Sequence, residues 1–203
     1  MEPIQEVPDL SAYLAADDVI DHHDPLVRET AALLAEGLHE PHEYAEVAYE
    51  YVRDAIPHSF DSGDPRVSWR ASDVLEQRNG ICYAKSHALT ALLRARGIPA
   101  GLCYQRLTED DGSDPALHGL IALRLPRVDR WIRLDPRGNR PGVDTRFSLT
   151  VERLAFPVRP ELGECDYPMV HAAPQPAVVA CLRAAPDSSG IVLPTELSGA
   201  AAG

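Results

Sequence analysis

The stretch that most constrains the fold is residues 80–105, where a cysteine-bearing helix is followed directly by a strand. Gly80 permits a sharp backbone turn ahead of an apolar pattern with three- and four-residue spacing, which predicts a helix that ends at Gly97. Cys82 therefore falls in the first helical turn, where free amide groups and the positive end of the helix dipole favour a thiolate. Since the thiolate is the reactive form of cysteine, Cys82 is a candidate nucleophile.

A cysteine in a helix also has a simpler interpretation, as a small buried apolar residue. Cys82 alone favours burial, and a catalytic role needs an imidazole and a carboxylate from elsewhere in the chain. His87 lies on another side of the same helix, so it does not supply that imidazole. Cys103 lies in the strand, where no helix dipole favours a thiolate, and we expect it in the core. The four cysteines form no C-x-x-C pair, so we expect no metal and no other cofactor.

Helical patterns precede the cysteine. Residues 25–38 and 44–54 each carry apolar side chains on one face and predict a helical hairpin, and a short helix near 72–78 ends at Asn79-Gly80. The run Asp21-His22-His23-Asp24 contains side chains that bind metals. A solvated segment that caps the first helix explains it more simply, because Asp24-Pro25 is a typical N-cap with proline in the first turn.

After Gly97 the apolar period changes from helical to alternating. Residues 102–106 predict a strand, an acidic loop follows, and a second alternating run opens at His118. A turn near residues 126–130 leads to a short strand that closes at Asp135, before a proline. If the last two strands form an antiparallel hairpin, His118 and Asp135 become cross-strand neighbours.

Composition restricts the class of protein. The chain has 203 residues, of which 45% are hydrophobic and 25% charged, as in an ordinary single globular domain. A formal net charge of -12 disfavours nucleic acid and anionic membrane surfaces as partners. The sequence starts without a basic and apolar leader and has no long apolar run, so we expect a cytoplasmic protein.

These patterns predict one α+β domain over residues 1–186. Its helical part spans about 1–97 and its sheet part about 98–156, with an irregular proline-rich part at 157–186. Small and polar residues at 187–203 predict a flexible C-terminal tail.

Three segments together resemble the core of the transglutaminase-like superfamily, and in particular its bacterial cysteine peptidases. They are Gly80-Ile81-Cys82-Tyr83 with the helix behind it, the strand that opens at His118, and Trp131-Ile132-Arg133-Leu134-Asp135-Pro136. The resemblance covers about residues 54–136. It implies a papain-like fold in which the N-terminal helices and a nucleophile-bearing helix pack on an antiparallel sheet.

By this resemblance Cys82 is the nucleophile, His118 the general base and acid, and Asp135 the residue that orients the histidine. One departure concerns the residues after the histidine, where many members have Ala-Trp and this chain has Gly119-Leu120. The amide of Cys82 is the natural first donor to an oxyanion, and an upstream side chain should be the second. Gln77 and Trp69 are the candidates for that second donor.

The expected activity is cysteine-dependent acyl transfer from an amide or peptide substrate through a Cys-His-Asp triad. Hydrolysis, as in a protease or amidase, is favoured over transamidation, because nothing in a chain of this size indicates a site for a protein-sized amine. Two alternatives stay open. One is a noncatalytic binding module on the same fold, and the other is an acyltransferase similar to arylamine acetyltransferases.

Overall fold

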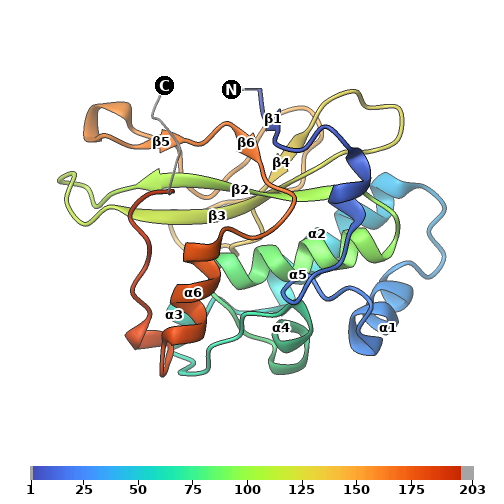
Figure 1. Cartoon of the computed structure of the whole chain (residues 1–203), viewed down its shortest axis with the longest axis horizontal. Helices are drawn as coiled ribbons and strands as arrows, with labels where there is room; N and C mark the ends of the chain where they lie inside the picture. Colours follow the sequence, from blue (N-terminus) through green and yellow to red (C-terminus); the bar gives the residue numbers. More distant parts are fainter. Residues whose placement is uncertain (1, 198–203) are drawn as a thin grey trace.

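The fold is built around one buried helix. The computed structural model describes residues 2–197, and α5 (Cys82–Ala95) crosses the middle of the molecule with every side chain from Cys82 to Arg94 buried (Figure 1). A helix that is enclosed on all sides must be covered by other elements along its whole length. The other helices cover it on one side and an antiparallel sheet covers it on the other, which confirms the predicted α+β architecture.

The remaining helices come mostly before α5. Asp24 caps the first of them by accepting a hydrogen bond from the amide of Leu26, so the acidic segment at this position has the capping role that was predicted. These helices are α1 (Pro25–Leu34), α2 (Pro41–Ala55), α3 (Ser59–Ser62), α4 (Ala71–Gln77) and, after the sheet, α6 (Pro176–Ala184); 3-10 turns occupy Leu10–Leu14, Pro160–Leu162 and Ser188–Gly190. None of the described helices is both long and apolar enough to cross a bilayer.

The main sheet has four antiparallel strands in the order β4-β3-β2-β5. Its strands are β2 (Ala100–Leu107), β3 (Ala116–Leu123), β4 (Ile132–Leu134) and β5 (Cys165–Asp166); β1 (Ile4–Gln5) and β6 (Met169–Val170) form a small parallel pair. The predicted hairpin is confirmed, because Ile121 of β3 lies opposite Leu134 of β4.

The two faces of the sheet bury different sets of side chains. Leu102, Tyr104 and Ile121 join the large core around α5, whereas Cys103 and Leu120 belong to a second cluster on the far face. Alternation along β2 and β3 produces this division. Cys103 is therefore a core residue, as predicted.

The prediction of an irregular, proline-rich part at residues 157–186 is wrong in one respect. This part contains β5, β6 and the nine-residue helix α6. Pro176 is the first residue of α6, where proline has no amide hydrogen bond to lose and its fixed φ angle suits a helix. Pro176 thus starts a helix, although a proline further along would prevent one.

The predicted flexible tail also differs from the structure over residues 187–197. The backbone of Ser188 bonds to Pro65, Leu197 is only 6% exposed, and the amide of Leu117 in β3 donates to Pro194 at 2.7 Å. This segment is therefore bound to the domain beside the start of β3. The end of the predicted tail, 198–203, lies outside the described residues.

Candidate active site

The start of α5 is held by the segment that follows α2. His58 and Gly80 form an isolated parallel bridge, and the amide of Ser59 donates to the carbonyl of Gly80 at 3.2 Å. A side chain at position 80 would be too close to Ala84, since an ideal Cβ there lies 2.9 Å from the Cβ of Ala84. Glycine thus lets the chain enter the helix tightly and leaves Cys82 as the first helical residue.

The structure brings His118 and Asp135 together across the sheet. The Nε2 atom of His118 lies 2.8 Å from Oδ2 of Asp135, with the histidine 5% and the aspartate 0% exposed. Extending the register past Ile121 and Leu134 makes the two residues diagonal neighbours on one face of the hairpin. A buried, charge-assisted hydrogen bond of this length fixes the orientation of the imidazole.

Asp135 is held by two further hydrogen bonds. The amide of Ala155 donates to its Oδ2 at 2.9 Å, and the amide of Arg137 donates to its Oδ1 at 3.1 Å. Burial raises the pKa of this carboxyl, but the charge of His118 and these donors outweigh burial and lower the pKa below its usual value. Asp135 is therefore a fixed negative charge beneath the histidine.

Cys82 is close enough to His118 to affect the pKa of its imidazole. Burial lowers the pKa of His118, but the charges of Asp135 and Cys82, and hydrogen bonds to both, outweigh it and raise the pKa to about 10. Nε2 is committed to Asp135, which leaves Nδ1 as the ring nitrogen for Cys82. The structure thus joins two of the three predicted residues, His118 and Asp135, by a hydrogen bond, and Cys82 is near enough to affect the pKa of His118.

The contact between α5 and β3 depends on Gly119, which stands where many members of the family have alanine. A Cβ at that position would lie 2.6 Å from Cδ1 of Tyr83, and the Tyr83 hydroxyl donates to the carbonyl of Leu117 at 2.5 Å. The ring of Tyr83 therefore fills the space beside the backbone of Gly119. This close approach places the residue after Cys82 against the residue after His118.

A second histidine, His58, contacts the backbone of the candidate nucleophile. Its Nε2 accepts a hydrogen bond from the backbone amide of Cys82 at 3.1 Å, and the side chain is 7% exposed. Burial, followed by the charge of Arg137, lowers the pKa of His58 to about 3, so the ring is neutral at physiological pH. The sequence offered no pattern that marks His58, because its contact arises from the pairing of two distant segments.

Lys85 is a further ionisable group near the site. It is fully buried one turn after Cys82 and donates to the carbonyls of Arg53 and Ile56 at the end of α2. Burial, with the nearby charge of Arg137, lowers its pKa to about 7. These hydrogen bonds join the end of α2 to the first turns of α5.

The proposed second oxyanion donors, Gln77 and Trp69, make no hydrogen bond to Cys82 within residues 2–197. The Trp69 ring instead lies within 5 Å of the guanidinium groups of Arg70 and Arg183, at 4.6 and 4.3 Å from its centroid. The carbonyl of Trp69 contacts Nδ1 of His87 at 2.9 Å, so this histidine points away from the thiol as predicted. Gln77 is the last residue of α4.

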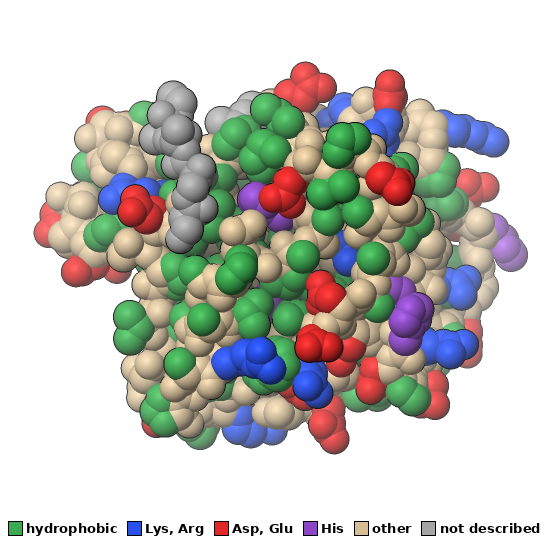
Figure 2. All heavy atoms as spheres, viewed as in Figure 1, with side chains coloured by type: hydrophobic (Ala, Val, Ile, Leu, Met, Phe, Trp, Pro, Cys, Tyr) green, Lys and Arg blue, Asp and Glu red, His purple; other side chains and the backbone are tan. Residues whose placement is uncertain are grey.

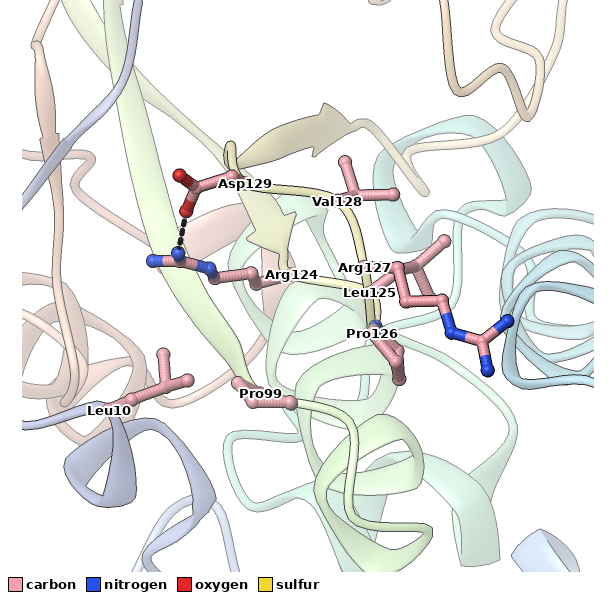
Figure 3. A pocket seen from close by; sticks show the side chains of 8 residues that line it. All are labelled: Leu10, Pro99, Arg124, Leu125, Pro126, Arg127, Val128 and Asp129. Atoms are coloured by element: carbon pink, nitrogen blue, oxygen red, sulfur yellow. Dashed lines mark hydrogen bonds and ion pairs between the residues drawn. The ribbon is translucent and has the colours of Figure 1, made fainter.

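Two hollows lie near opposite ends of β3. The one in Figure 3, of about 420 Å³, is lined by Pro99 and by residues 124–129, at the far end of β3 from His118. The other, of about 450 Å³, is lined in part by Ala116 and Phe156. The Phe156 ring meets His118 edge-on with 5.2 Å between ring centroids, so this second hollow adjoins His118 through Phe156. A further hollow, of about 370 Å³, is lined in part by His58, Lys85 and Arg137.

A sequence profile for the Transglutaminase-like superfamily matches residues 28–136, which is more than half of the chain. The chain belongs to this superfamily. The matched part of this transglutaminase-like protein includes Cys82, His118 and Asp135, as well as His58. No curated protein matches the chain.

Solved structures share the fold of this transglutaminase-like protein. It is similar to a proposed cysteine protease from Cytophaga hutchinsonii, with a TM-score of 0.52 and 18% identity over 64% of this chain and 43% of the other. The periplasmic domain of TgpA from Pseudomonas aeruginosa gives 0.47 and 21% over 63% and 47%. Red sea bream transglutaminase gives 0.45 and 12% over 64% and 32%. The matched part spans less than half the length of each of these structures.

Proposed function

We propose that this protein is a cysteine-dependent acyl-transfer enzyme that acts on amide or peptide bonds, with water as the favoured acceptor. The observation that carries the proposal is the buried 2.8 Å contact between His118 and Asp135, with Cys82 in the first turn of α5 and close enough to raise the pKa of His118. A noncatalytic scaffold has no need for three such groups in this order.

The chemistry follows from the protonation states. His118 holds a proton between Cys82 and Asp135, and the thiolate of Cys82 attacks the carbonyl carbon so that an S–C bond forms and the π electrons move to oxygen. The oxyanion then collapses, the C–N bond breaks, and His118 gives its proton to the leaving amine. Water, deprotonated by His118, attacks the thioester and releases the acid and Cys82.

Iodoacetamide labelling tests the nucleophile. We expect Cys82 to react much faster than Cys103, because burial raises the pKa of the Cys103 thiol to about 12. His118→Ala should slow the labelling of Cys82, and Cys82→Ser should remove the fast-reacting thiol. Equal rates for the two cysteines in the wild type, with no effect of His118→Ala, would contradict the triad.

Turnover tests the acyl acceptor. Activity-based probes with electrophilic amide and peptide groups would identify the acyl group that Cys82 accepts. Addition of hydroxylamine as a competing amine then measures partition of the acyl-enzyme between water and amine. If hydrolysis is the main reaction, the carboxylic acid remains the dominant product at millimolar hydroxylamine. Transfer of an acyl group from acyl-CoA would instead indicate the acetyltransferase alternative.

A further inference from the structure

His58 is a polar side chain that contacts the backbone amide beside which an oxyanion would form. When Cys82 attacks a carbonyl, the negative oxygen lies close to the Cys82 amide, because the carbon that carries this oxygen is bonded to Sγ of the same residue. In the structure this amide already has an acceptor, which is Nε2 of His58 at 3.1 Å. A substrate oxygen must take that hydrogen bond from His58.

The hydrogen bonding of His58 defines its tautomer. A backbone amide can only donate, so Nε2 carries a lone pair and the proton of the neutral ring lies on Nδ1. Nδ1 is buried and has no protein partner within the described part of the chain. No group therefore holds the proton on Nδ1, and the ring can exchange one neutral tautomer for the other.

The surroundings keep His58 from competing with His118 for a proton. The positive charges of Arg137, Lys85 and His118 lower the pKa of His58. The negative charge of Asp61 raises it. Asp61 is already paired with Arg137, at 2.7 and 3.0 Å. A neutral imidazole can donate a hydrogen bond to a developing oxyanion without taking the proton that the leaving group needs.

We propose that His58 is a further catalytic residue, which together with the backbone amide of Cys82 donates a hydrogen bond to the oxyanion of the tetrahedral intermediate. When the substrate oxygen replaces Nε2 as the acceptor of the amide, two acceptors would face each other. The ring removes this repulsion when Nδ1 gives its proton to a water molecule and Nε2 takes a proton from water, so its charge is unchanged. This role replaces the one predicted for Gln77 or Trp69, and it rests on the proposed acyl transfer at Cys82.

A structural role is the competing interpretation, in which His58 only caps the first amide of α5. The two roles separate when Cys82 reacts with two different reagents. Acylation by p-nitrophenyl acetate passes through a tetrahedral oxyanion, whereas alkylation by iodoacetamide displaces iodide and forms none. A donor to the oxyanion affects only the first reaction, and a cap that positions the thiol affects both.

The decisive variants are His58→Leu and His58→Gln, with His87→Leu as the matched control. His87 is also a buried, neutral histidine, and it bonds to a carbonyl away from the thiol. We expect His58→Leu to slow acylation by about 100-fold, the usual effect of removing one oxyanion donor. Alkylation should be unchanged, His58→Gln should recover most of the acylation rate, and His87→Leu should change neither rate.

Other outcomes overturn the assignment. Equal loss of acylation and alkylation in His58→Leu means a structural cap, and loss of neither means that His58 has no role. If His58→Leu does not fold, His58→Phe keeps the aromatic ring without a polar atom and is judged by the same two rates. If wild-type Cys82 is neither acylated nor alkylated faster than Cys103, the proposed function itself fails and this assignment fails with it.

Discussion

Two histidines lie beside Cys82, and the structure gives them different protonation states. His118 comes from the sheet and contacts a carboxylate, whereas His58 comes from the segment after α2 and contacts a backbone amide. Both are more than nine-tenths buried, yet the pKa of one is raised to about 10 and that of the other is lowered to about 3. Burial acts on both in the same direction, so the difference comes from their partners.

In the proposed mechanism, His118 is the acid and the neutral His58 is a hydrogen-bond donor, and both act at Cys82. Asp135 stabilises the protonated form of His118, while Arg137 beside His58 is a cation that disfavours protonation there. Figure 2 shows charged side chains of both signs spread over one face of the molecule, with no broad basic area. The charge pattern that matters is therefore the buried one, around the start of α5.

The largest effect is expected from removing the carboxylate on the His118 side. Asp135→Asn should lower the rate of acyl transfer by about 10⁴-fold, the effect seen when an aspartate of this kind is replaced and the histidine adopts the wrong tautomer. Steady-state and single-turnover rates measure it. Asp61→Asn is the matched control, since Asp61 pairs with Arg137 rather than with His118, and comparable losses in both variants would contradict the distinction between the two sides.

The pH dependence of stability tests both sides at once. Each histidine has a pKa near 6.5 when unfolded. His118 keeps its proton up to about pH 10 in the folded state, so its stabilisation is full below pH 6.5 and is lost as the pH rises through 10. His58 stays neutral down to about pH 3, so its contribution is present above pH 6.5 and is lost as the pH falls towards 3.

Urea unfolding from pH 3 to 10 measures these two limbs. Each group should contribute a slope of up to about 1.4 kcal/mol per pH unit within its range. His118→Ala should remove the alkaline loss, which in the wild type is opposed by Lys85, because a pKa lowered to about 7 makes stability rise with pH in that range. His58→Leu should flatten part of the acidic limb, to which His87, with a pKa lowered to about 4 by burial, also contributes. If both variants changed the same limb, the opposite pKa shifts of the two histidines would be wrong.

A smaller effect is expected where α5 meets β3 on the His118 side. Gly119→Ala adds a methyl group 2.6 Å from the Tyr83 ring and should destabilise the fold by about 1 to 3 kcal/mol, the usual cost of overpacking. Denaturant unfolding measures it. Tyr83→Ala in the same chain removes the clash, so the double variant should lose less than the sum of the single losses, and simple additivity would exclude this contact as the cause.

The smallest effect concerns the C-terminal segment, which bonds to Leu117 of β3 through Pro194 and to Pro65, after α3, through Ser188. Leu197→Ala should cost about 2 kcal/mol because the side chain is 6% exposed. Val192→Ala, in the same segment but 82% exposed, should change stability by less than about 0.5 kcal/mol. Equal values would mean that residues 187–197 are not anchored through Leu197.

The sequence was sufficient to predict that His118 and Asp135 come together. Alternating apolar residues on either side of a turn at 126–130 defined a hairpin, and its register brought His118 next to Asp135. The helix that begins at Cys82 was equally clear, since Gly80 precedes it and Gly97 follows it. Local patterns were enough here because each element is continuous in the sequence.

The His58 side could not be predicted in the same way. Its contact depends on a single bridge between His58 and Gly80, and a pairing this short has no periodic apolar pattern that would predict it. Helix α6 and the bound segment 187–197 were missed for a related reason, because prolines and small residues permit order that only tertiary contacts create.

The hydrogen bond from Leu117 to Pro194 has a practical consequence for handling this protein. Leu117 precedes His118, so a load applied through the C-terminal end is transmitted to the strand that carries the histidine. An affinity tag, surface tether or fused partner attached at the C-terminal end would therefore act on the strand of His118. The loop at residues 108–114 is no quieter a point of attachment, because it joins β2 to β3 and leads directly into the same strand.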